Sequence, residues 1–313
     1  MKALGLDIGG ANLKAVSGNY GEIIYFPMWK RFHELTGELR RIYHLTNPDR
    51  VGVVITAELS DCFQSRKEGI EFVYRAVKKS FDSEIYFIDK EGRLSEEIEK
   101  HELYFASNWV AGAKFLVEEG WNNFILADMG STTTDLIPVT DKIEAGRADY
   151  TRLRKKELLY TGVLRTPVFY VLPEFDVPLI PEYFAVTADV FRITGDIGAE
   201  DYSCETPDGK GKRIDDCIRR LARCVCLDAG GNEKYVVQMA EEVRKRILEK
   251  VAGALKELSD KYGICDVLGC GIGEFLLERA AEASKLNYIS LSKHYEFSEL
   301  FPAFAISKIV ESL

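Results

Sequence analysis

A short segment near the N-terminus recurs 121 residues later, and this repeat constrains the fold more than any other feature of the sequence. Residues 7–16, DIGGANLKAV, align without gaps with residues 128–137, DMGSTTTDLI. In each copy an apolar strand ends in Asp-x-Gly and a small residue, and a second strand follows directly. A repeat of this kind indicates that one supersecondary unit is used twice. We therefore expect two related α/β halves, each built around such a β-hairpin.

Hydrophobic periodicity predicts the elements around the first hairpin. Residues 67–81 carry Ile70, Val73 and Val77 at three-to-four spacing, which is typical of an amphipathic helix. Residues 51–56 are almost entirely apolar and predict a buried strand. The same criteria predict the other elements of the first half, namely strands over 3–8, 12–17, 22–28 and 84–88 and helices over 34–45 and 106–119.

A proline-rich segment interrupts the second half. Residues 148–212 contain five of the nine prolines, so we expect an inserted region made mainly of loops. Pro302 suits the first turn of a last helix over 303–312. We divide the chain into a first domain over 1–120 and a second over 121–302, with that last helix packing back on the first. The remaining predicted elements are helices over 185–193, 213–227 and 234–262, a strand over 265–268 and a helix that begins at 274.

Charge and hydropathy argue against two classes of partner. The chain has 41 basic and 50 acidic side chains, a formal charge of −9, and no block of Lys or Arg that would attract nucleic acid. Its longest apolar runs are strand-sized, far short of the ~20 residues that span a bilayer. Asp7 interrupts the first apolar segment before a secretory signal can form. We therefore expect a cytoplasmic protein that binds neither nucleic acid nor membrane; the oligomeric state stays open, a homo-oligomer included.

The tips of the two hairpins carry residues suited to bind phosphate. Glycine allows backbone N–H groups to approach an anion closely, and the second hairpin adds hydroxyl donors. The candidate phosphate-binding residues are Gly9, Gly10, Asn12, Lys14, Gly130, Ser131, Thr132 and Thr133. For either copy alone, an ordinary hairpin with a polar tip is the alternative.

Three acidic residues lie at the same hairpins. Asp7, Asp128 and Asp135 would repel a polyphosphate unless a cation sits between them. Mg²⁺ is the natural candidate because it is bound by one or two carboxylates together with phosphate oxygens. We therefore predict that these three residues are metal ligands.

A third glycine site lies near the C-terminus. Residues 269–273, GCGIG, connect a predicted strand to a predicted helix. Gly269, Gly271 and Gly273 would let the backbone pass under a flat ligand, or would place an anion at the helix N-terminus. The spacing is not that of the dinucleotide-binding fingerprint, and no following strand ends in the acidic residue which that motif requires.

The seven cysteines and four histidines show no disulfide or zinc framework. Cys224 and Cys226 are separated by one residue and lie near Cys204 and Cys217, whereas paired zinc ligands are usually two to four residues apart. The histidines form no HExxH pair. We expect reduced thiols, with a small metal site at these cysteines as the alternative.

The three glycine sites, in this order, resemble the phosphate 1, phosphate 2 and adenosine motifs of the actin/hexokinase/Hsp70 superfamily. The resemblance covers nearly the whole chain and implies an α/β, duplicated ribonuclease-H-like (actin-like ATPase) fold with two domains around a central cleft. Residues 128–135, DMGSTTTD, are similar to the signature of the hydantoinase A/oxoprolinase branch. Further segments are similar to tetrahydromethanopterin-linked C1-transfer pathway proteins of archaea and methylotrophs, namely residues 55–63, 65–69, 106–109, 159–167 and 187–192.

That family implies a particular reaction. Its archaeal members include an aryl-ether synthase of methanofuran biosynthesis, which joins an aminomethylfuran-methyl diphosphate to the phenol of γ-glutamyltyramine and releases diphosphate. The resemblance therefore implies a transferase that acts on these two small molecules with Mg²⁺ and does not require ATP. Whether the loop at Gly269 still binds a nucleotide, or holds the furan or tyramine group instead, stays open.

Two other classes of function share the fold. An ATP-dependent small-molecule kinase or a hydantoinase-like hydrolase is the first alternative, and a non-catalytic actin/Hsp70-like nucleotide switch is the second. Sugar kinases of the superfamily commonly use an Asn-Asp pair before a helix to deprotonate the acceptor hydroxyl. Here the segment reads Ser107-Asn108-Trp109, and asparagine cannot take up a proton. A switch would need a partner-binding domain, for which 313 residues leave little room.

Three carboxylates are candidates for the catalytic base that accepts the phenol proton. Glu58 and Asp61 follow a predicted buried strand, where ligand sites of α/β proteins usually open. Asp189 lies in the predicted helix of the inserted region. The alternatives are that Asp61 caps a turn and that Asp189 lies on the solvated face of its helix.

The remaining candidates would bind substrate. Lys14 and Arg66 would add positive charge near the diphosphate, and Arg165 and Arg192 would bind the glutamyl carboxylates bidentately. A solvated side chain for Lys14 and surface ion pairs for the arginines are the alternatives. The full set of candidate substrate-binding residues is Arg66, Asn108, Tyr160, Arg165, Arg192, Gly269, Gly271 and Gly273.

Overall fold

The computed structural model describes all 313 residues, which form two compact units. Unit 1 contains Met1–Leu126, Ile137–Lys155 and Leu291–Leu313, and unit 2 contains Ala127–Leu136 and Lys156–Ser290. The observed border therefore differs from the predicted one at residue 120. The chain leaves unit 1 at the end of its first long segment, returns to it after the second hairpin, and returns again for the C-terminal helix.

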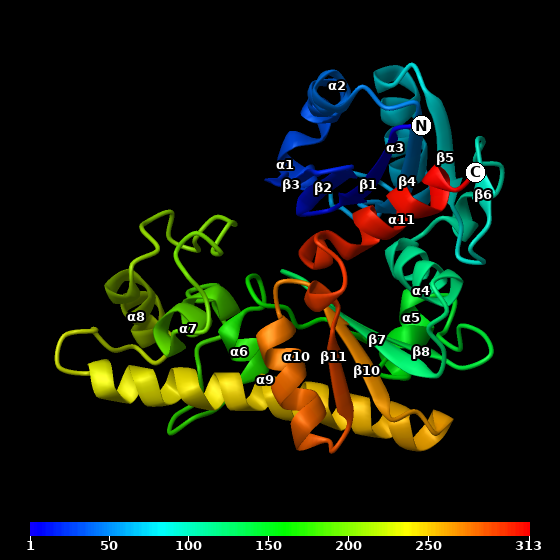
Figure 1. The fold of residues 1–313 in the computed structure, drawn as a ribbon. Coiled ribbons are helices and arrows are strands. Elements are labelled where there is room, and N and C mark those ends of the chain that lie inside the picture. Colours follow the sequence, from blue (N-terminus) through cyan, green and yellow to red (C-terminus); the bar gives the residue numbers. More distant parts are fainter. The chain divides into compact units, whose positions relative to one another are not determined.

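Unit 1 is built on a six-stranded sheet (Figure 1). Its strands are β1 (Ala3–Gly9), β2 (Asn12–Ser17), β3 (Tyr20–Tyr25), β4 (Arg50–Thr56), β5 (Glu84–Ile88) and β6 (Leu94–Ser95). Their order is β3-β2-β1-β4-β5-β6, with β1 antiparallel to β2 and parallel to β4. Its helices are α1 (Met28–Arg31), α2 (Leu35–Thr46), α3 (Arg66–Ser80), α4 (Asn108–Glu118), α5 (Asp149–Arg154) and α11 (Phe301–Glu311).

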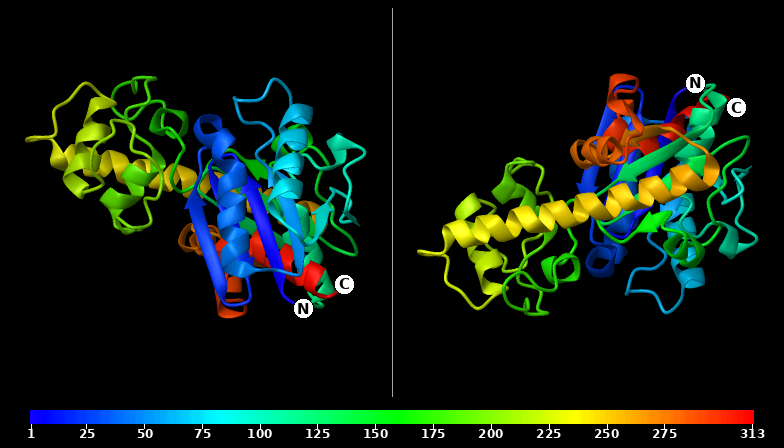
Figure 2. Two further views of the ribbon diagram at one scale, coloured as in Figure 1. Left: turned by 90° about the horizontal axis from the view of Figure 1, so that it is seen from above. Right: turned by 90° about the horizontal axis from the view of Figure 1, so that it is seen from below.

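The two faces of this sheet are covered differently because side chains alternate along each strand. Leu4 and Leu6 are fully buried and belong to the apolar core that β1 shares with α2 and α3. Gly5 faces α11, and a Cβ atom there would overlap the carbonyl oxygen of Ala303. Gly52 is its partner on β4, and a side chain there would also collide with α11. The glycines thus let α11 pack directly on the face opposite α2 and α3 (Figures 1 and 2).

The second sheet has five strands and repeats the order of the first. Its strands are β7 (Phe124–Met129), β8 (Thr134–Val139), β9 (Leu158–Leu159), β10 (Asp266–Cys270) and β11 (Asn287–Ser290). The order β9-β8-β7-β10-β11 corresponds to β3-β2-β1-β4-β5 when each is counted from its own hairpin. This correspondence confirms the predicted duplicated ribonuclease-H-like α/β fold.

The helices of unit 2 are arranged along α9. They are α6 (Val168–Val171), α7 (Thr187–Thr194), α8 (Ile214–Arg223), α9 (Glu233–Tyr262) and α10 (Glu274–Ala283). Figure 2 shows α9, 30 residues long, running beside α6, α7 and α8, and α10 also packs on it. Gly263 ends α9 in the left-handed conformation, with φ of 69°. No helix of the chain combines the length and the apolar character that crossing a bilayer demands.

Short elements account for most differences from the predicted pattern. The sequence predicts one helix within residues 148–212, whereas the structure has α5, α6 and α7 there, together with β9. It predicts neither β6 nor β11, because two- and four-residue strands are too short to show a period. The long predicted helices and the buried strands are all present, with ends that move by a few residues.

The close approach of α11 to the sheet gives a stability prediction. Gly5→Ala should lower the free energy of unfolding by about 1–3 kcal/mol, because the new methyl group would push α11 away from β1. Gly37→Ala is the matched control, because Gly37 is at an exposed position of α2 with open space where a Cβ atom would lie. Alanine there should raise the free energy of unfolding by up to about 1 kcal/mol. Urea denaturation followed by circular dichroism measures both changes, and equal stability of Gly5→Ala and wild type would contradict the packing argument.

Candidate functional site

The first hairpin holds Asp7 beside a basic residue. Asp7 is almost fully buried and lies opposite Lys14 in the β1–β2 register. Its carboxylate is 4.0 Å from Lys14 Nζ and accepts a hydrogen bond from Thr56 Oγ1 at 3.4 Å. The Lys14 side chain is only 16% exposed, so the alternative of a solvated lysine is not what the structure shows. This hairpin therefore presents a local acid–base pair.

Glycine is needed at the tip of this hairpin. A Cβ atom at Gly9 would lie 2.8 Å from the carbonyl oxygen of Asn12, so no side chain fits without opening the turn. The carbonyl of Gly10 accepts a hydrogen bond from the backbone N–H of Met28 at 2.8 Å. The backbone of Gly9 and Gly10 is therefore held in a defined turn. Contact of this turn with phosphate stays a prediction.

The second hairpin uses one of its predicted anion donors internally. The backbone N–H of Gly130 donates to the carbonyl of Thr133 at 3.0 Å, which closes the turn. The hydroxyl oxygens of Ser131 and Thr132 lie 3.4 Å apart, and Arg165 Nη1 donates to Thr132 Oγ1 at 3.3 Å. Because the Gly130 N–H is engaged in the turn, the two hydroxyls and the guanidinium are the better candidates for anion contact.

The segment after β9 braces the second hairpin from outside. The carbonyl of Gly130 accepts the N–H of Val163, and that of Ser131 accepts the N–H of Leu164, each at 3.0 Å. A Cβ atom at Gly162 would lie 2.5 Å from the backbone nitrogen of Thr132, so the two backbones are in direct contact. The predicted 159–167 motif is therefore part of the hairpin's support; Tyr160, which it also contains, is 48% exposed.

The third glycine loop packs on the end of β7. Gly271 has φ of +89°, and a Cβ atom there would lie 2.5 Å from the carbonyl oxygen of Met129 and 2.6 Å from a carboxylate oxygen of Asp128. The N–H of Gly273 donates to the same Met129 carbonyl at 3.0 Å. At Gly269 a side chain would collide with the Tyr288 ring. These glycines are explained by close packing, and ligand binding by this loop stays a prediction.

Glu58 and Arg66 form a second candidate centre, in unit 1. Glu58 follows β4, and Arg66 is the first residue of α3. Two hydrogen bonds cap this helix start: the Glu68 N–H donates to Ser65 Oγ at 3.2 Å, and the Gln64 N–H donates to the Glu68 carboxylate at 2.8 Å. The cap therefore places the Arg66 side chain beside the loop that carries Glu58.

A single guanidinium nitrogen joins two carboxylates at this centre. Arg66 Nη2 donates to Glu58 Oε1 at 2.5 Å and to Asp149 Oδ2 at 2.9 Å, and the guanidinium lies over the Phe105 ring at 4.4 Å. Glu58 is 2% exposed, and its Oε2 atom is buried without a hydrogen-bond partner. Burial raises the pKa of Glu58, and Arg66 opposes this rise.

Further charges surround this centre. Lys90 Nζ lies 5.6 Å from the centroid of the same Phe105 ring, and burial lowers its pKa, with a further contribution from Arg66. Arg152 is buried over the Trp109 ring and lies 3.7 Å from Asp149. Asp149 and Arg152 are not among the residues predicted from the sequence, because they lie in the segment predicted to form loops. Their i, i+3 spacing of opposite charges is the one sign of a helix that the sequence offers there.

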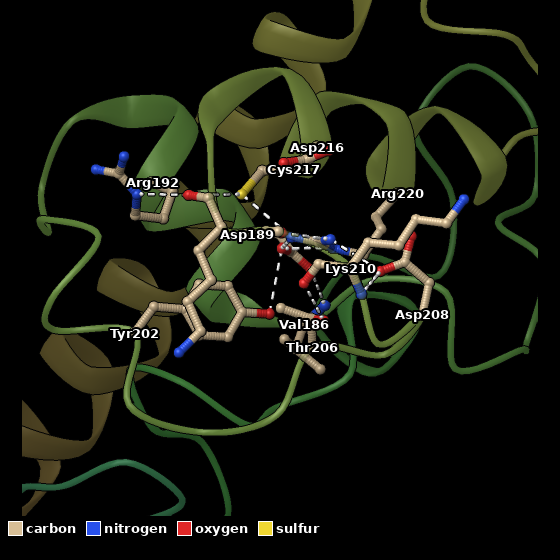
Figure 3. Close-up of polar contacts among 12 residues, drawn as sticks. Val186, Asp189, Arg192, Tyr202, Thr206, Asp208, Lys210, Asp216, Cys217 and Arg220 are labelled. Atoms are coloured by element: carbon tan, nitrogen blue, oxygen red, sulfur yellow. Dashed lines mark hydrogen bonds and ion pairs between the residues drawn. The ribbon is translucent and has the colours of Figure 1, made fainter.

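Asp189 lies in a different, saturated network in unit 2 (Figure 3). It is fully buried and accepts hydrogen bonds from Arg220 Nη2 at 2.7 Å, Arg220 Nε at 2.9 Å, the Tyr202 hydroxyl at 3.2 Å and the Val186 N–H at 3.1 Å. Arg220 also donates to Asp208 at 3.0 Å. Burial raises the pKa of Asp189 and Arg220 opposes the rise. A solvated helix face is therefore wrong for Asp189, and its occupied oxygens do not favour a role as proton acceptor.

Three other predicted residues are placed as follows. Asp61 is exposed in the loop between β4 and α3. Asn108 is half-buried at the start of α4. Arg192 donates to the backbone carbonyls of Ile197 at 2.7 Å and Lys212 at 3.3 Å, so its guanidinium binds the surrounding loop. These contacts give Arg192 a structural role in place of a carboxylate site.

No three His, Cys, Asp or Glu side chains group closely enough to form a preassembled metal site. This holds for Cys204, Cys217, Cys224 and Cys226, which are free thiols. The oxygen donors of Asp128, Asp135, Ser131 and Thr132 have the hardness that Mg²⁺ prefers. An ion there would take few protein ligands and complete its shell with water and substrate oxygens.

Residues 49–312 match the Hydantoinase/oxoprolinase family model. The chain belongs to this family. It is 39% identical, over 98% of its length and 97% of the relative's, to the (4-{4-[2-(γ-L-glutamylamino)ethyl]phenoxymethyl}furan-2-yl)methanamine synthase of Methanocaldococcus jannaschii. It is 32% identical over 64% of its length to the synthase of the same name from Methanococcus vannielii, of which 96% is covered. Similarity to named synthases, one of them over nearly the full length of both chains, supports an enzymatic role for this family member.

Solved structures with this fold are distant in sequence. A ROK family glucokinase from Streptomyces griseus, in complex with glucose and AMPPNP, matches over the whole of both chains with a TM-score of 0.55 and 10% identity. Nucleotide-free acetone carboxylase matches 92% of this chain and 50% of its own with a TM-score of 0.52, also at 10% identity. At such identity these likenesses show the fold alone, which the hydantoinase/oxoprolinase family member shares with them.

The network around Asp189 gives a prediction that separates a structural role from a catalytic one. Asp189→Asn should lower the free energy of unfolding by about 3–5 kcal/mol, because the buried Arg220 would lose the carboxylate that accepts two of its hydrogen bonds and would keep only Asp208 as an acidic partner. Asp215→Asn, at an exposed position of α8, is the control and should change stability by less than about 0.5 kcal/mol. Chemical denaturation measures both. A stably folded but inactive Asp189→Asn variant would instead restore Asp189 as a catalytic candidate.

Proposed function

We propose that this hydantoinase/oxoprolinase family member is an aryl-ether synthase of methanofuran biosynthesis. It would join an aminomethylfuran-methyl diphosphate to the phenol of γ-glutamyltyramine and release diphosphate. The observation that carries the proposal is the 39% identity to the Methanocaldococcus jannaschii synthase, which extends over nearly the full length of both chains. The transferase class follows from this proposed donor, whose diphosphate is the leaving group.

The proposed reaction breaks one carbon–oxygen bond and forms another. The bond between the furfuryl carbon and the diphosphate oxygen breaks, and its electron pair leaves with diphosphate. The furan oxygen delocalises the positive charge that develops on the carbon. A lone pair of the phenol oxygen forms the new ether bond, and the phenol proton passes to a base of the protein. The products are the aryl ether, diphosphate and one protonated carboxyl group.

Glu58 is the carboxylate best suited to accept that proton. Its Oε1 atom is anchored by Arg66, whereas its buried Oε2 atom has no partner. A general base works best when its pKa lies near the working pH, and burial moves the pKa of Glu58 in that direction. Asp61 is exposed, and both carboxylate oxygens of Asp189 accept hydrogen bonds. Neither residue therefore combines burial with an oxygen that has no hydrogen-bond partner.

The second hairpin is proposed to bind the diphosphate. The Ser131 and Thr132 hydroxyls donate hydrogen bonds, and the guanidinium of Arg165, oriented by its bond to Thr132, adds positive charge. Arg165 therefore serves the leaving group in this proposal, in place of the glutamyl carboxylate that the sequence suggested. Mg²⁺, held by Asp128 and Asp135, would supply neutralising charge for the departing diphosphate when bound.

The structure gives less support to phosphotransfer from ATP. The glucokinase likeness shows the fold and carries no information about substrate at 10% identity. Asn108, the first residue of α4, is at the position compared with the catalytic base of the sugar kinases. Its amide cannot accept a proton. We therefore retain the diphosphate transferase as the proposed function.

A direct assay tests this function. Purified protein with Mg²⁺, the furfuryl diphosphate and γ-glutamyltyramine should form the ether and release diphosphate in equal amounts without ATP. Glu58→Gln should lower kcat by about 10²–10⁴-fold, the usual effect of removing a general base. Glu71→Gln, on the exposed face of α3, is the matched control. Strict dependence on ATP would overturn the transferase, and undiminished activity of Glu58→Gln would overturn the assignment of the base.

The metal proposal has its own test. Asp135→Asn should raise the Mg²⁺ concentration needed for half-maximal activity by about tenfold or more, because a carboxylate ligand is lost. Asp141→Asn, in an exposed turn after β8, should leave that concentration unchanged. Titration of diphosphate release against Mg²⁺ measures both variants. An unchanged Mg²⁺ requirement in Asp135→Asn, or full activity in the presence of a chelator, would refute the magnesium site.

A further inference from the structure

Asp149 has no role in the function proposed above, yet it shares one nitrogen of Arg66 with Glu58. We infer that Asp149 is a positioning residue: it holds Arg66 so that the guanidinium binds one oxygen of Glu58 and leaves the other for the acceptor hydroxyl. The inference rests on the proposed function in one respect, namely that Glu58 is the proton acceptor. It adds to that proposal the group that keeps the acceptor oxygen open.

The geometry of the bridge is unusual for arginine. A guanidinium beside a single carboxylate commonly makes two parallel hydrogen bonds, which would occupy both oxygens of Glu58. Here the Nη2 atom alone serves both carboxylates, at 2.5 Å to Glu58 and 2.9 Å to Asp149. The Nε atom of Arg66 is buried and has no partner. Asp149 therefore competes with Glu58 for the guanidinium and turns a two-bond pairing into a one-bond pairing.

Packing restricts the guanidinium further. The Cζ atom of Arg66 lies over the Phe105 ring, 4.4 Å from its centroid, and this contact limits rotation about the end of the side chain. The arginine also stands at the N-terminus of α3, where the helix dipole disfavours a positive charge. Two acidic partners offset this cost. The position of Arg66 thus depends on carboxylates from two distant parts of unit 1, and removal of either one should change how it meets the other.

Three charged groups act on Glu58, and a fourth lies beside one of them. Arg66 of α3 stabilises its ionised form, and Asp149 at the start of α5 destabilises it. Lys90, after β5, interacts electrostatically with Glu58. Arg152 of α5 lies 3.7 Å from Asp149. Because Asp149 is the only negative group among the four, its neutralisation should ease ionisation of Glu58. Arg66 would then also be able to bind both Glu58 oxygens. This second effect lowers the Glu58 pKa as well.

A purely structural role for Asp149 is the competing explanation. An acidic residue in the first turn of α5 would stabilise that short helix through its dipole, without any effect on Glu58. If Asp149 had only this role, Asp149→Asn would change the stability of the protein and leave the pKa of Glu58 unchanged. The pH dependence of activity separates the two explanations, because only a residue coupled to Glu58 moves the pKa of that carboxyl group.

The test compares substitutions with opposite expected signs. Activity requires ionised Glu58, so the acidic limb of the kcat/KM profile follows its pKa. Asp149→Asn should move this limb to lower pH by roughly one unit, because a neighbouring negative charge is removed. Arg66→Gln should move it to higher pH, because the stabilising positive charge is removed. Asp149→Glu keeps the charge and should stay close to wild type.

A second readout does not depend on turnover. Carbon-13 NMR of protein labelled at glutamate side-chain carboxyls, with the Glu58 signal assigned by its loss in Glu58→Gln, reports the same pKa directly. A downward move in Asp149→Asn and an upward move in Arg66→Gln support the inference even in a protein that makes no ether, in which case only the proposed function fails. An unmoved Glu58 pKa in Asp149→Asn, with normal melting temperature, overturns the inference and leaves the synthase proposal intact.

Discussion

Backbone packed directly on backbone sets the geometry of both units. In unit 1, Gly5 and Gly52 remove the side chains that would keep α11 away from the sheet. In unit 2, Gly162 and Gly271 bring two loops against the backbone of the second hairpin and the end of β7. Contacts of this kind leave little freedom to shift, because interiors are close-packed and peptide groups do not change rotamer. Side chains carried by these segments are therefore held in place before any ligand arrives.

Two buried carboxylate–arginine networks use this rigidity for different ends. Around Asp189, every strong donor nearby is engaged, and Arg220 itself is fully buried with two acidic partners. Such a network stabilises one arrangement of α7 and α8, and both oxygens of Asp189 are occupied. Around Glu58 the same pair of residue types is arranged with one oxygen left unbonded. An unsatisfied buried oxygen costs stability, and sites that retain such a cost are commonly functional.

The sequence predicts the local parts of this structure and not the long-range ones. The hairpins follow from apolar runs that end in Asp-x-Gly, and α3 follows from its periodic apolar face. The centre at Glu58 depends on Asp149, which is 91 positions further along the chain (149 − 58) and lies in a segment whose prolines and glycines hide a six-residue helix. The error at Asp189 has a similar cause, since its partner Arg220 is 31 residues away and local patterns cannot reveal it.

The duplication also shows how the two copies have diverged in charge. With the offset of 121 residues, Asp7 corresponds to Asp128, and Lys14 corresponds to Asp135. In the first copy the acid is therefore balanced by a lysine across the hairpin, at 4.0 Å. In the second copy two acids occupy the equivalent positions, beside hydroxyls that suit phosphate. The proposed Mg²⁺ site therefore lies at the second hairpin, because Asp7 in the first hairpin already has Lys14 across from it. In the proposed function the two copies of one hairpin unit would then differ in charge: the first pairs its acid with a lysine, and the second would hold Mg²⁺ together with the diphosphate.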